Sequence, residues 1–394
     1  MSIKDEEMRT IEAISLHNLL SFGPDAETIA LKSLNVLIGP NGSGKSNFIE
    51  AISLLRSAPG DMRAVIRRGG GVGDWIWKGD LEGFATINAV IRNPQASVPL
   101  RHVLAFRNDN QSFRLVDERI EDFKSHPGSK KPNFYYDYGN GNPVINIKSE
   151  QRLLKPETVQ ADQSILAQRR EPEIYPEISY LADIYERIRI FRDWRFGRNA
   201  IFREPQKADM RSDRLEEDFS NLGLFLSRLR RVPRAKNMIL EALRDLYEGI
   251  DDFDVSIEGG AVQVFFTEGD FAIPATRLSD GTLRYLCLLA VLCDPSPPPL
   301  ICIEEPELGL HPDILPKLAD LLIAASQRTQ LIVTTHSDIL VDAMTERPDA
   351  VLICEKHGSR TEIKRLDAED LEKWLKDYRL GELWTRGALG GTRW

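Results

Sequence analysis

A glycine-rich segment, GPNGSGKS at residues 39–46, lies between a short apolar run and a helical pattern. Gly39, Gly42 and Gly44 allow backbone N–H groups to converge on phosphate oxygens without interference from a Cβ atom. The spacing G-x-x-x-x-G-K-S is that of a phosphate-binding loop, in which Lys45 reaches the β- and γ-phosphates and the Ser46 hydroxyl binds Mg²⁺. The residues expected to bind a nucleotide here are Gly39, Pro40, Asn41, Gly42, Ser43, Gly44, Lys45, Ser46 and Asn47.

Two adjacent glutamates, Glu304 and Glu305, come at the end of the apolar run LICIE. Open α/β sheets present their ligand site at this end of a strand. Beside a triphosphate, Glu304 would bind Mg²⁺ through water, and Glu305 would hold and deprotonate the attacking water. The alternative is a surface acidic pair at a strand end. We favour the catalytic interpretation because two charges directly after five apolar residues are costly to bury without a partner.

A third strand pattern, QLIVTT, ends in Thr334, Thr335 and His336. An imidazole at this place could hydrogen-bond the γ-phosphate and sense its loss. A single histidine at a strand end is more often structural, but the order of the motifs favours a functional role for His336.

The segment RLSDGT, residues 277–282, precedes an apolar helical run although serine, aspartate and glycine weaken helices. At a helix start, Ser279, Asp280 and Gly281 offer a hydroxyl, bare backbone N–H groups and the positive end of the helix dipole. The chain would then have two phosphate-binding sites for one nucleotide, the glycine-rich loop and the serine segment. We therefore expect a dimer in which the serine segment of each subunit completes the phosphate loop of the other.

The surrounding patterns predict an α/β protein. Continuous apolar runs at residues 300–304, 330–335 and 350–355 indicate parallel strands covered on both faces. Alternating patterns between residues 84 and 120, with a hairpin at 133–147, indicate an antiparallel β subdomain. Residues 176–249 have helical spacing, and Gly259-Gly260 marks a further hairpin. We divide the chain into residues 1–155, a helical insertion at 156–250, and residues 251–394.

Composition limits the function. The 394 residues carry a net charge of −9, which argues against indiscriminate nucleic-acid binding. Residues 186–236 nevertheless hold 14 Lys/Arg against 8 Asp/Glu. The four cysteines lie in apolar stretches without metal-ligand spacing, which indicates buried residues in a reducing compartment. Because no signal-like segment and no run of 18 apolar residues occurs, we expect a cytoplasmic protein without a membrane partner.

The ordered motifs GPNGSGKS, RLSDGT, ICIEEPELGLHP and VTTHS resemble those of ABC-type ATPase heads of the RecF, SMC and OLD group. The likeness is greatest to stand-alone bacterial predicted ATPases of the AAA family, and it extends to FRDWRFGR, DFSNLGLFLSRL and YRLGELWTRGALGG. It implies an ABC-type P-loop ATPase head with an antiparallel β subdomain and a helical insertion, which sandwiches two ATP molecules with Mg²⁺ between two subunits. It also implies that Ser279 contacts the γ-phosphate in trans, that Glu305 is the catalytic base and that His336 is the switch histidine.

Three positions depart from the pattern or stay open. Glu304 stands where many ABC proteins have aspartate, and this departure is common in RecF- and OLD-like members. His311 falls where transporters carry the aspartate of the loop that crosses the dimer interface. For the glutamine loop, Gln111 and Gln151 both remain candidates. No second acidic cluster follows that would fit the nuclease domain of OLD proteins, so any nuclease is expected to be a separate polypeptide.

Two roles are compatible with the sequence. In the first, ATP-driven closure of a homodimer or higher homo-oligomer acts on DNA in repair or anti-phage defence; the arginines at 187, 189, 192, 195, 198, 228, 230 and 231 would meet phosphates and Trp194 would stack on a base. The alternative for these arginines is a solvated face with internal ion pairs. In the second role, the dimer is an ATP-switched scaffold for a partner effector. A transporter subunit is disfavoured because the helical insertion is large.

Overall fold

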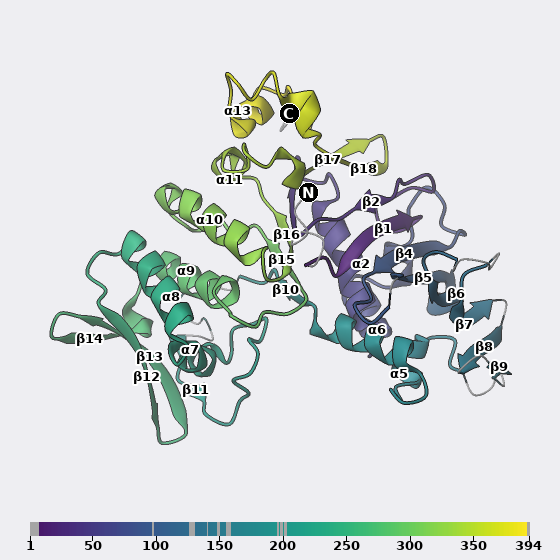
Figure 1. The fold of residues 1–394 in the computed structure, drawn as a ribbon, viewed down its shortest axis with the longest axis horizontal. Coiled ribbons are helices and arrows are strands. Elements are labelled where there is room, and N and C mark those ends of the chain that lie inside the picture. The colour runs from purple at the N-terminus through teal and green to yellow at the C-terminus, as the bar shows by residue number, and fades with distance from the viewer. Residues whose placement is uncertain are drawn as a thin grey trace.

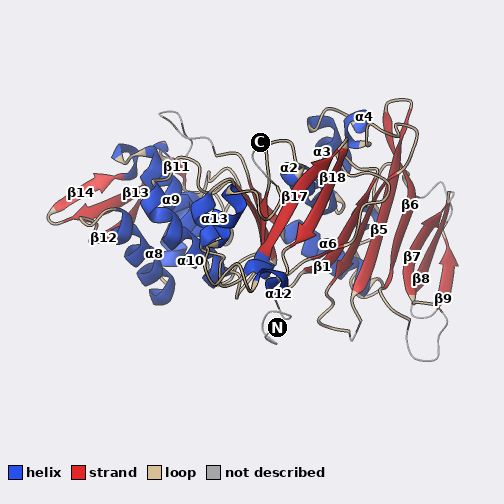
Figure 2. Cartoon of the chain, turned by 90° about the horizontal axis from the view of Figure 1, so that it is seen from above, coloured by secondary structure: helices blue, strands red, loops and turns tan. Residues whose placement is uncertain are grey.

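The computed structural model describes residues 8–96, 98–125, 131–139, 141–147, 150–154, 159–194, 197, 200 and 203–391. These residues form three β-sheets with helices packed between and around them (Figures 1 and 2). The N-terminal antiparallel sheet lies at one end of the molecule and the small sheet of β11 to β14 at the other, with the central sheet between them (Figure 1).

The central sheet brings the ends of the predicted motif strands to one edge. Its strand order is β10-β15-β16-β3-β17-β18. The first five strands run parallel, and β18 pairs antiparallel with β17. The bounds are β3 (Leu34–Ile38), β10 (Arg189–Phe191), β15 (Leu300–Glu304), β16 (Gln330–Thr334), β17 (Val351–His357) and β18 (Arg360–Arg365). The three apolar runs predicted to be parallel strands are confirmed.

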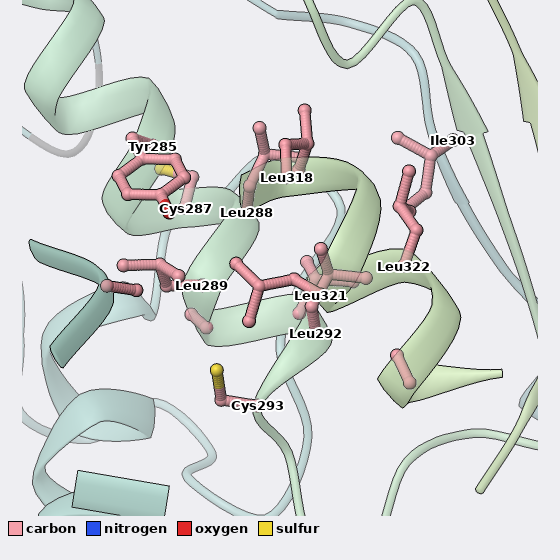
Figure 3. Close-up of a cluster of buried hydrophobic side chains, with 14 of the residues drawn as sticks. Tyr285, Cys287, Leu288, Leu289, Leu292, Cys293, Ile303, Leu318, Leu321 and Leu322 are labelled. Carbon is pink, nitrogen blue, oxygen red and sulfur yellow. The ribbon is translucent and has the colours of Figure 1, made fainter. Parts of the chain in front are cut away.

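Alternate residues of the central strands enter two separate cores, which explains why these strands are apolar throughout. Val36 and Ile38 belong to the core on one face of the sheet, whereas Leu37 belongs to the core on the other. The first face is covered by α9 (Asp280–Leu292) and α10 (Leu315–Ala325), whose leucines pack against one another, with Tyr285 at one side of the cluster (Figure 3). The second face packs against α2 (Lys45–Ser57) and α6 (Pro176–Arg187).

The N-terminal sheet has the strand order β2-β1-β4-β5-β6-β7-β8-β9, all antiparallel. Its bounds are β1 (Ile11–His17), β2 (Ile29–Ala30), β4 (Ala85–Ile91), β5 (Leu100–Asp109), β6 (Ser112–Asp122), β7 (Phe134–Gly139), β8 (Asn142–Ile147) and β9 (Glu150–Leu153). The predicted antiparallel subdomain and its hairpin are confirmed. Three short helices flank it: α3 (Met62–Arg68), α4 (Val72–Trp75) and α5 (Ile165–Gln168).

The segment with helical spacing is only partly helical. After α6 the chain forms strand β10, which pairs with β15 at the edge of the central sheet. The helical prediction was therefore wrong for residues 189–191, where pairing with a strand far along the sequence decides the conformation. The remaining helices there are α7 (Leu222–Arg230) and α8 (Pro233–Leu246).

The small sheet closes the far end of the molecule. Its strands are β11 (Gln206–Lys207), β12 (Asp252–Glu258), β13 (Ala261–Glu268) and β14 (Phe271–Pro274), with the expected hairpin at Gly259-Gly260. The C-terminal helices are α11 (Asp338–Asp342), α12 (Ala368–Leu371) and α13 (Leu380–Thr385). All four cysteines are buried and free, as predicted. None of the helices in the described ranges has the length and apolar character needed to cross a membrane.

Candidate nucleotide site

The glycine-rich segment forms a loop between β3 and α2, at the C-terminal edge of the central sheet. Gly39 and Gly44 adopt φ values of 147° and 102°, in the region that favours glycine. Lys45 is largely buried, and its Nζ donates hydrogen bonds to the carbonyl oxygens of Gly39 (2.8 Å) and Pro40 (3.0 Å). Burial lowers the pKa of this ammonium group. The loop therefore holds its cation close to the backbone that would receive phosphate.

The packing leaves no room for side chains at two of these glycines. A Cβ atom on Gly39 would lie 2.2 Å from the carbonyl oxygen of Cys354, and one on Gly44 would lie 2.2 Å from Oγ1 of Thr361. The Thr361 hydroxyl donates to the carbonyl oxygen of Ser43 at 3.0 Å. Strand β18 therefore packs against the phosphate loop and stabilises its conformation through Thr361. Thr361 could not be predicted as a contact of the loop, because it lies in an ordinary alternating strand.

Ser46 and Glu304, the two predicted metal ligands, lie together. Ser46 Oγ donates to Glu304 Oε2 at 3.1 Å, and Glu304 Oε1 lies 3.4 Å from Nε of Arg192. Burial raises the pKa of Glu304, and the Arg192 charge opposes this effect. Within the described residues, Oε1 is buried and accepts no hydrogen bond. A hydroxyl and a carboxylate oxygen with spare acceptor capacity suit Mg²⁺, so the donor set fits the metal.

Glu305 occupies a strained position beside His336. Its φ is 46°, in the left-handed region that costs a residue with a side chain about 1–3 kcal/mol. Three contacts hold it there: its N–H donates to Thr334 O (3.0 Å) and Oγ1 (3.2 Å), and its carbonyl accepts from Arg284 Nη2 (2.9 Å). Glu305 Oε1 lies 3.6 Å from Nε2 of His336. The structure thus brings the predicted base and the predicted switch histidine into contact.

A third carboxylate, that of Glu307, holds the backbone of His336. Its Oε1 accepts hydrogen bonds from Thr335 Oγ1 (2.8 Å) and from the His336 N–H (2.7 Å). Burial raises the pKa of Glu307. Its Oε2 is buried and makes no hydrogen bond in the described part of the chain. The sequence analysis missed this residue, although a third acidic side chain in EEPE was visible.

The serine segment lies in a different lobe from the phosphate loop. Ser279 caps α9 by accepting from the Thr282 N–H at 3.1 Å, and both Ser279 and Asp280 are exposed. Asp280 pairs with Arg203 at 2.5 Å, which lowers its pKa. No hydrogen bond among the described residues joins residues 279–281 to residues 39–47. Helices α9 and α2 lie on opposite sides of the central sheet in both views (Figures 1 and 2).

Trp194 is half-buried, and its ring contacts other residues of the chain, which argues against the prediction that it stacks on a base. Its ring stacks on Phe219 with a centroid distance of 5.6 Å, and the Arg284 guanidinium lies 4.5 Å from its centroid. Its Nε1 donates to the carbonyl oxygen of Glu304 at 2.7 Å. The ring packs against Phe219 and Arg284, and the hydrogen bond of its N–H to Glu304 fixes the C-terminal end of β15.

Most of the arginines expected to face DNA make internal contacts. Arg192 pairs with Glu50 and Glu304, and Arg228 pairs with Asp294 at 2.9 Å. Further pairs are Arg187 with Asp183, and Arg230 with Asp252 and Asp254. Arg189 is buried, whereas Arg231 is exposed. Arg195 and Arg198 lie outside the described residues. The internal-ion-pair alternative therefore holds for most of the described arginines.

The open positions remain unassigned. Gln111 lies in the exposed turn between β5 and β6, and its N–H donates to Asn108 Oδ1 at 2.8 Å. The side chain of Gln151 lies outside the described part. His311 is exposed, lies 3.2 Å from Asp313, and begins the short helix at residues 312–314.

The fold is that of an ABC-type ATPase head, as two solved structures show. The SMC head bound to the C-winged helix domain of ScpA aligns with a TM-score of 0.57 and 16% identity, over 92% of this chain and 99% of that chain. The SMC head with an extended coiled coil bound to the C-terminal domain of ScpA, derived from Pyrococcus furiosus, aligns with a TM-score of 0.53 and 14% identity, over 93% and 99%.

The family follows from the sequence itself. The chain belongs to the family described as "AAA domain, putative AbiEii toxin, Type IV TA system", whose profile matches residues 34–342. A comparison with curated proteins finds no match. The predicted resemblance to ABC-type ATPase heads of the RecF and SMC group is confirmed by the family and by the two structures together.

Proposed function

We propose that this protein binds and hydrolyses ATP with the residues gathered at the C-terminal edge of the central sheet. Backbone N–H groups of residues 39–47 and the Lys45 ammonium would hold the phosphates. Ser46 and Glu304 would hold Mg²⁺, which neutralises developing charge on phosphate oxygens. The buried acceptor Glu304 Oε1 and the loop without room for Cβ atoms support this assignment.

Glu305 is placed to act as general base. It would accept a proton from water while the water oxygen attacks the γ-phosphorus and the bond to the β-phosphate oxygen breaks, giving ADP and phosphate. His336, 3.6 Å from the Glu305 carboxylate, would orient that carboxylate and contact the γ-phosphate. Glu307 would hold the backbone of His336 through its hydrogen bond to the N–H.

A homodimer completes the site. The observation that carries this proposal is the exposed Ser279 cap at the start of α9, which makes no hydrogen bond to residues 39–47 within the described part of the chain. A Cβ atom on Gly281 would lie 3.1 Å from the carbonyl oxygen of Gly309, so the serine segment abuts the loop that follows Glu305. In a head-to-tail pair, both segments of one subunit would face the phosphates held by the other.

The test is the molar mass by light scattering of Glu305→Gln with and without Mg-ATP. We expect the mass to double with ATP, and we expect Ser279→Arg to abolish this change while leaving binding of a fluorescent ATP analogue intact. Thr276→Arg, an exposed substitution just outside the segment, is the matched control. A molar mass that is the same with and without Mg-ATP in every variant would refute the ATP-dependent sandwich dimer.

Of the two physiological roles, the structure favours the ATP-switched scaffold. The arginines that would have contacted DNA largely pair within the chain, and both aligned SMC heads are described as bound to ScpA, a protein partner. We propose that the dimer, in the cytoplasm, holds or regulates a separate effector protein, for which a nuclease is one candidate class. Action on DNA in repair or anti-phage defence is the second candidate.

Binding to labelled duplex DNA at low salt separates these roles. The scaffold predicts no ATP-dependent binding by Glu305→Gln at about 50 mM salt, where phosphate contacts are strongest. Tight binding that weakens steeply with salt and is reduced by Arg231→Gln would instead establish the DNA role.

A further inference from the structure

A cavity of about 300 Å³ lies at the opposite end of the central sheet from the nucleotide site. Its lining includes Arg189, the first residue of β10, and Ile301, near the start of β15, which are paired in register. Because β10 and β15 run parallel to β3, their first residues lie at the edge away from Glu304 and the phosphate loop. The cavity is therefore a separate site.

The cavity has an excess of positive charge. Four arginines line it, at positions 187, 189, 211 and 214, against two aspartates. Both aspartates already have partners: Asp213 Oδ1 accepts from Arg211 at 2.8 Å, and Asp294 accepts from Arg228 at 2.9 Å. Arg211 is paired in this way, Arg187 pairs with Asp183 outside the lining at 3.5 Å, and Arg214 has only the distant partner Glu216 at 3.9 Å, so the least compensated charge is that of Arg189.

Arg189 is the centre of this excess. The residue is 7% exposed, and its Nη1 donates to the carbonyl oxygens of Glu186 (2.9 Å) and Ile188 (2.7 Å). Within the described ranges, no carboxylate lies within ion-pair distance of its guanidinium. Burial and, after it, the neighbouring charge of Arg214 lower its pKa to about 10, and the charge of Glu217 opposes this shift. A buried cation with only neutral acceptors, next to a second cation, is costly unless an anion joins it.

The other walls are apolar. Phe191, Phe225, Val291 and Ile301 are all buried and line the cavity, together with two consecutive prolines at 297 and 298. A cavity that combines charged side chains with apolar walls, at the lower end of the usual ligand-cavity volume, suits a small organic molecule with both a charged and an apolar group. Arg189 and Phe191 are alternate residues of β10 and lie on the same face of that strand, so the cavity offers a charged and an apolar contact side by side.

We propose that this cavity binds a small organic anion, with a phosphate, sulfonate or carboxylate group at Arg189 and Arg214 and a flat apolar group against Phe191 and Phe225. The ligand class follows from both features together. The positive charge selects an anion, and the apolar walls select a molecule with an apolar group. The site is independent of the ATP site and of the dimer.

The probe for this proposal is 8-anilinonaphthalene-1-sulfonate, an aromatic anion whose fluorescence rises on binding. The full-length chain with Lys45→Ala, which disables the phosphate loop, is titrated with the dye and then with competitors. We expect one saturable site per chain. Phenyl phosphate should displace the dye at concentrations at least about tenfold lower than inorganic phosphate or benzyl alcohol, because only phenyl phosphate carries both a charged and an apolar group.

Three variants decide the outcome. Arg214→Gln, whose ion pair with Glu216 is long at 3.9 Å, should weaken dye binding about tenfold, the effect of losing one charge-assisted hydrogen bond. Ser296→Trp should abolish binding by filling the cavity. Exposed Arg231→Gln, outside the lining, should leave it unchanged. Circular dichroism verifies that each variant is folded. Binding that is non-saturable, or equal in all three variants, would overturn the proposal.

Discussion

Replacing Arg192 with glutamine tests whether an internal cation keeps Glu304 charged at the proposed metal position. Arg192 pairs with Glu50 and lies 3.4 Å from Glu304 Oε1, and the side chains of Arg192 and Glu304 are 26% and 16% exposed. Burial raises the pKa of Glu304, and Arg192 is the largest effect that opposes the rise. Without Arg192, the carboxylate loses its nearest counter-ion but keeps its burial.

The expected magnitude follows from this geometry. An opposite charge at such a distance lowers a carboxyl pKa by about 1–3 units, and each unit corresponds to about 1.4 kcal/mol. Because both groups retain some contact with water, we expect Arg192→Gln to reduce the free energy of unfolding by roughly 1–3 kcal/mol at pH 7.

The sign of the pH dependence is fixed by the direction of the shift. The folded-state pKa of Glu304 lies above its unfolded value, and the substitution raises it further. The loss of stability is therefore complete above the variant's pKa and shrinks as the pH falls through the two folded-state values. Below both values the carboxyl is protonated in wild type and variant alike, and the loss attributable to Glu304 disappears.

Urea unfolding at pH 7, 6 and 5 measures this loss, and a double-mutant cycle assigns it. In a Glu304→Gln background, where no charge needs compensation, Arg192→Gln should cost much less than in the wild type. Glu50→Gln is the matched control, because it removes the other partner of Arg192 and leaves Glu304 with its cation. A cost that is independent of pH and equal in both backgrounds would refute the reasoning.

Three further substitutions test the contacts around the site. Gly44→Ala should lower the affinity for a fluorescent ATP analogue by at least about tenfold, because the φ of 102° and a contact of 2.2 Å both oppose a Cβ atom; unchanged affinity in a titration would contradict this. Glu307→Leu should reduce kcat in a phosphate-release assay roughly 10- to 100-fold with little change in KM, because the His336 N–H loses its acceptor. Glu307→Gln keeps a carbonyl oxygen and should lose less activity. Equal losses in the two variants would argue against a positioning role. Gly381→Val should lower stability by about 1–3 kcal/mol in urea unfolding, because its Cβ would meet a backbone oxygen of α11 at 2.4 Å; an unchanged midpoint would show that α13 can shift.

The central strands and the phosphate loop were predictable because their information is local. The run LNVLIGPNGSGKS contains a buried strand, the glycines of the loop and the start of α2 within thirteen consecutive residues. The glutamates and the histidine were predictable for a related reason. Parallel strands end at one edge of a sheet, so residues that follow two apolar runs meet there, as Glu305 and His336 do.

The partners of these residues could not be predicted, because their positions depend on pairing between distant segments. Arg192 reaches Glu304 only because β10 pairs with β15, about a hundred residues further along the chain. In the sequence, the same arginine belongs to a helical pattern with a basic face, which favoured a nucleic-acid surface. Thr361 supports the phosphate loop only because β18 pairs with β17. Periodicity describes one segment at a time and cannot show such contacts.

The C-terminal segment explains how the two sides of the candidate site are held in one geometry. Gly391 donates its N–H to Glu355 on β17 at 2.6 Å and accepts from Trp384 Nε1 at 2.9 Å. A Cβ atom on Gly391 would lie 3.7 Å from the Cα of Gly39, so the segment touches the phosphate loop. The same segment contains α13, which packs on α11 through the Gly381 N–H.

Helix α11 begins two residues after His336, and Gly381 donates to its Asp342 at 2.7 Å. One short piece of chain therefore contacts both the loop proposed to bind phosphate and the helix behind the proposed switch histidine. A displacement of the histidine on loss of the γ-phosphate would press on α11 and so on α13. Because packed elements shift as units rather than deform continuously, we expect such a displacement to move α11 and α13 together.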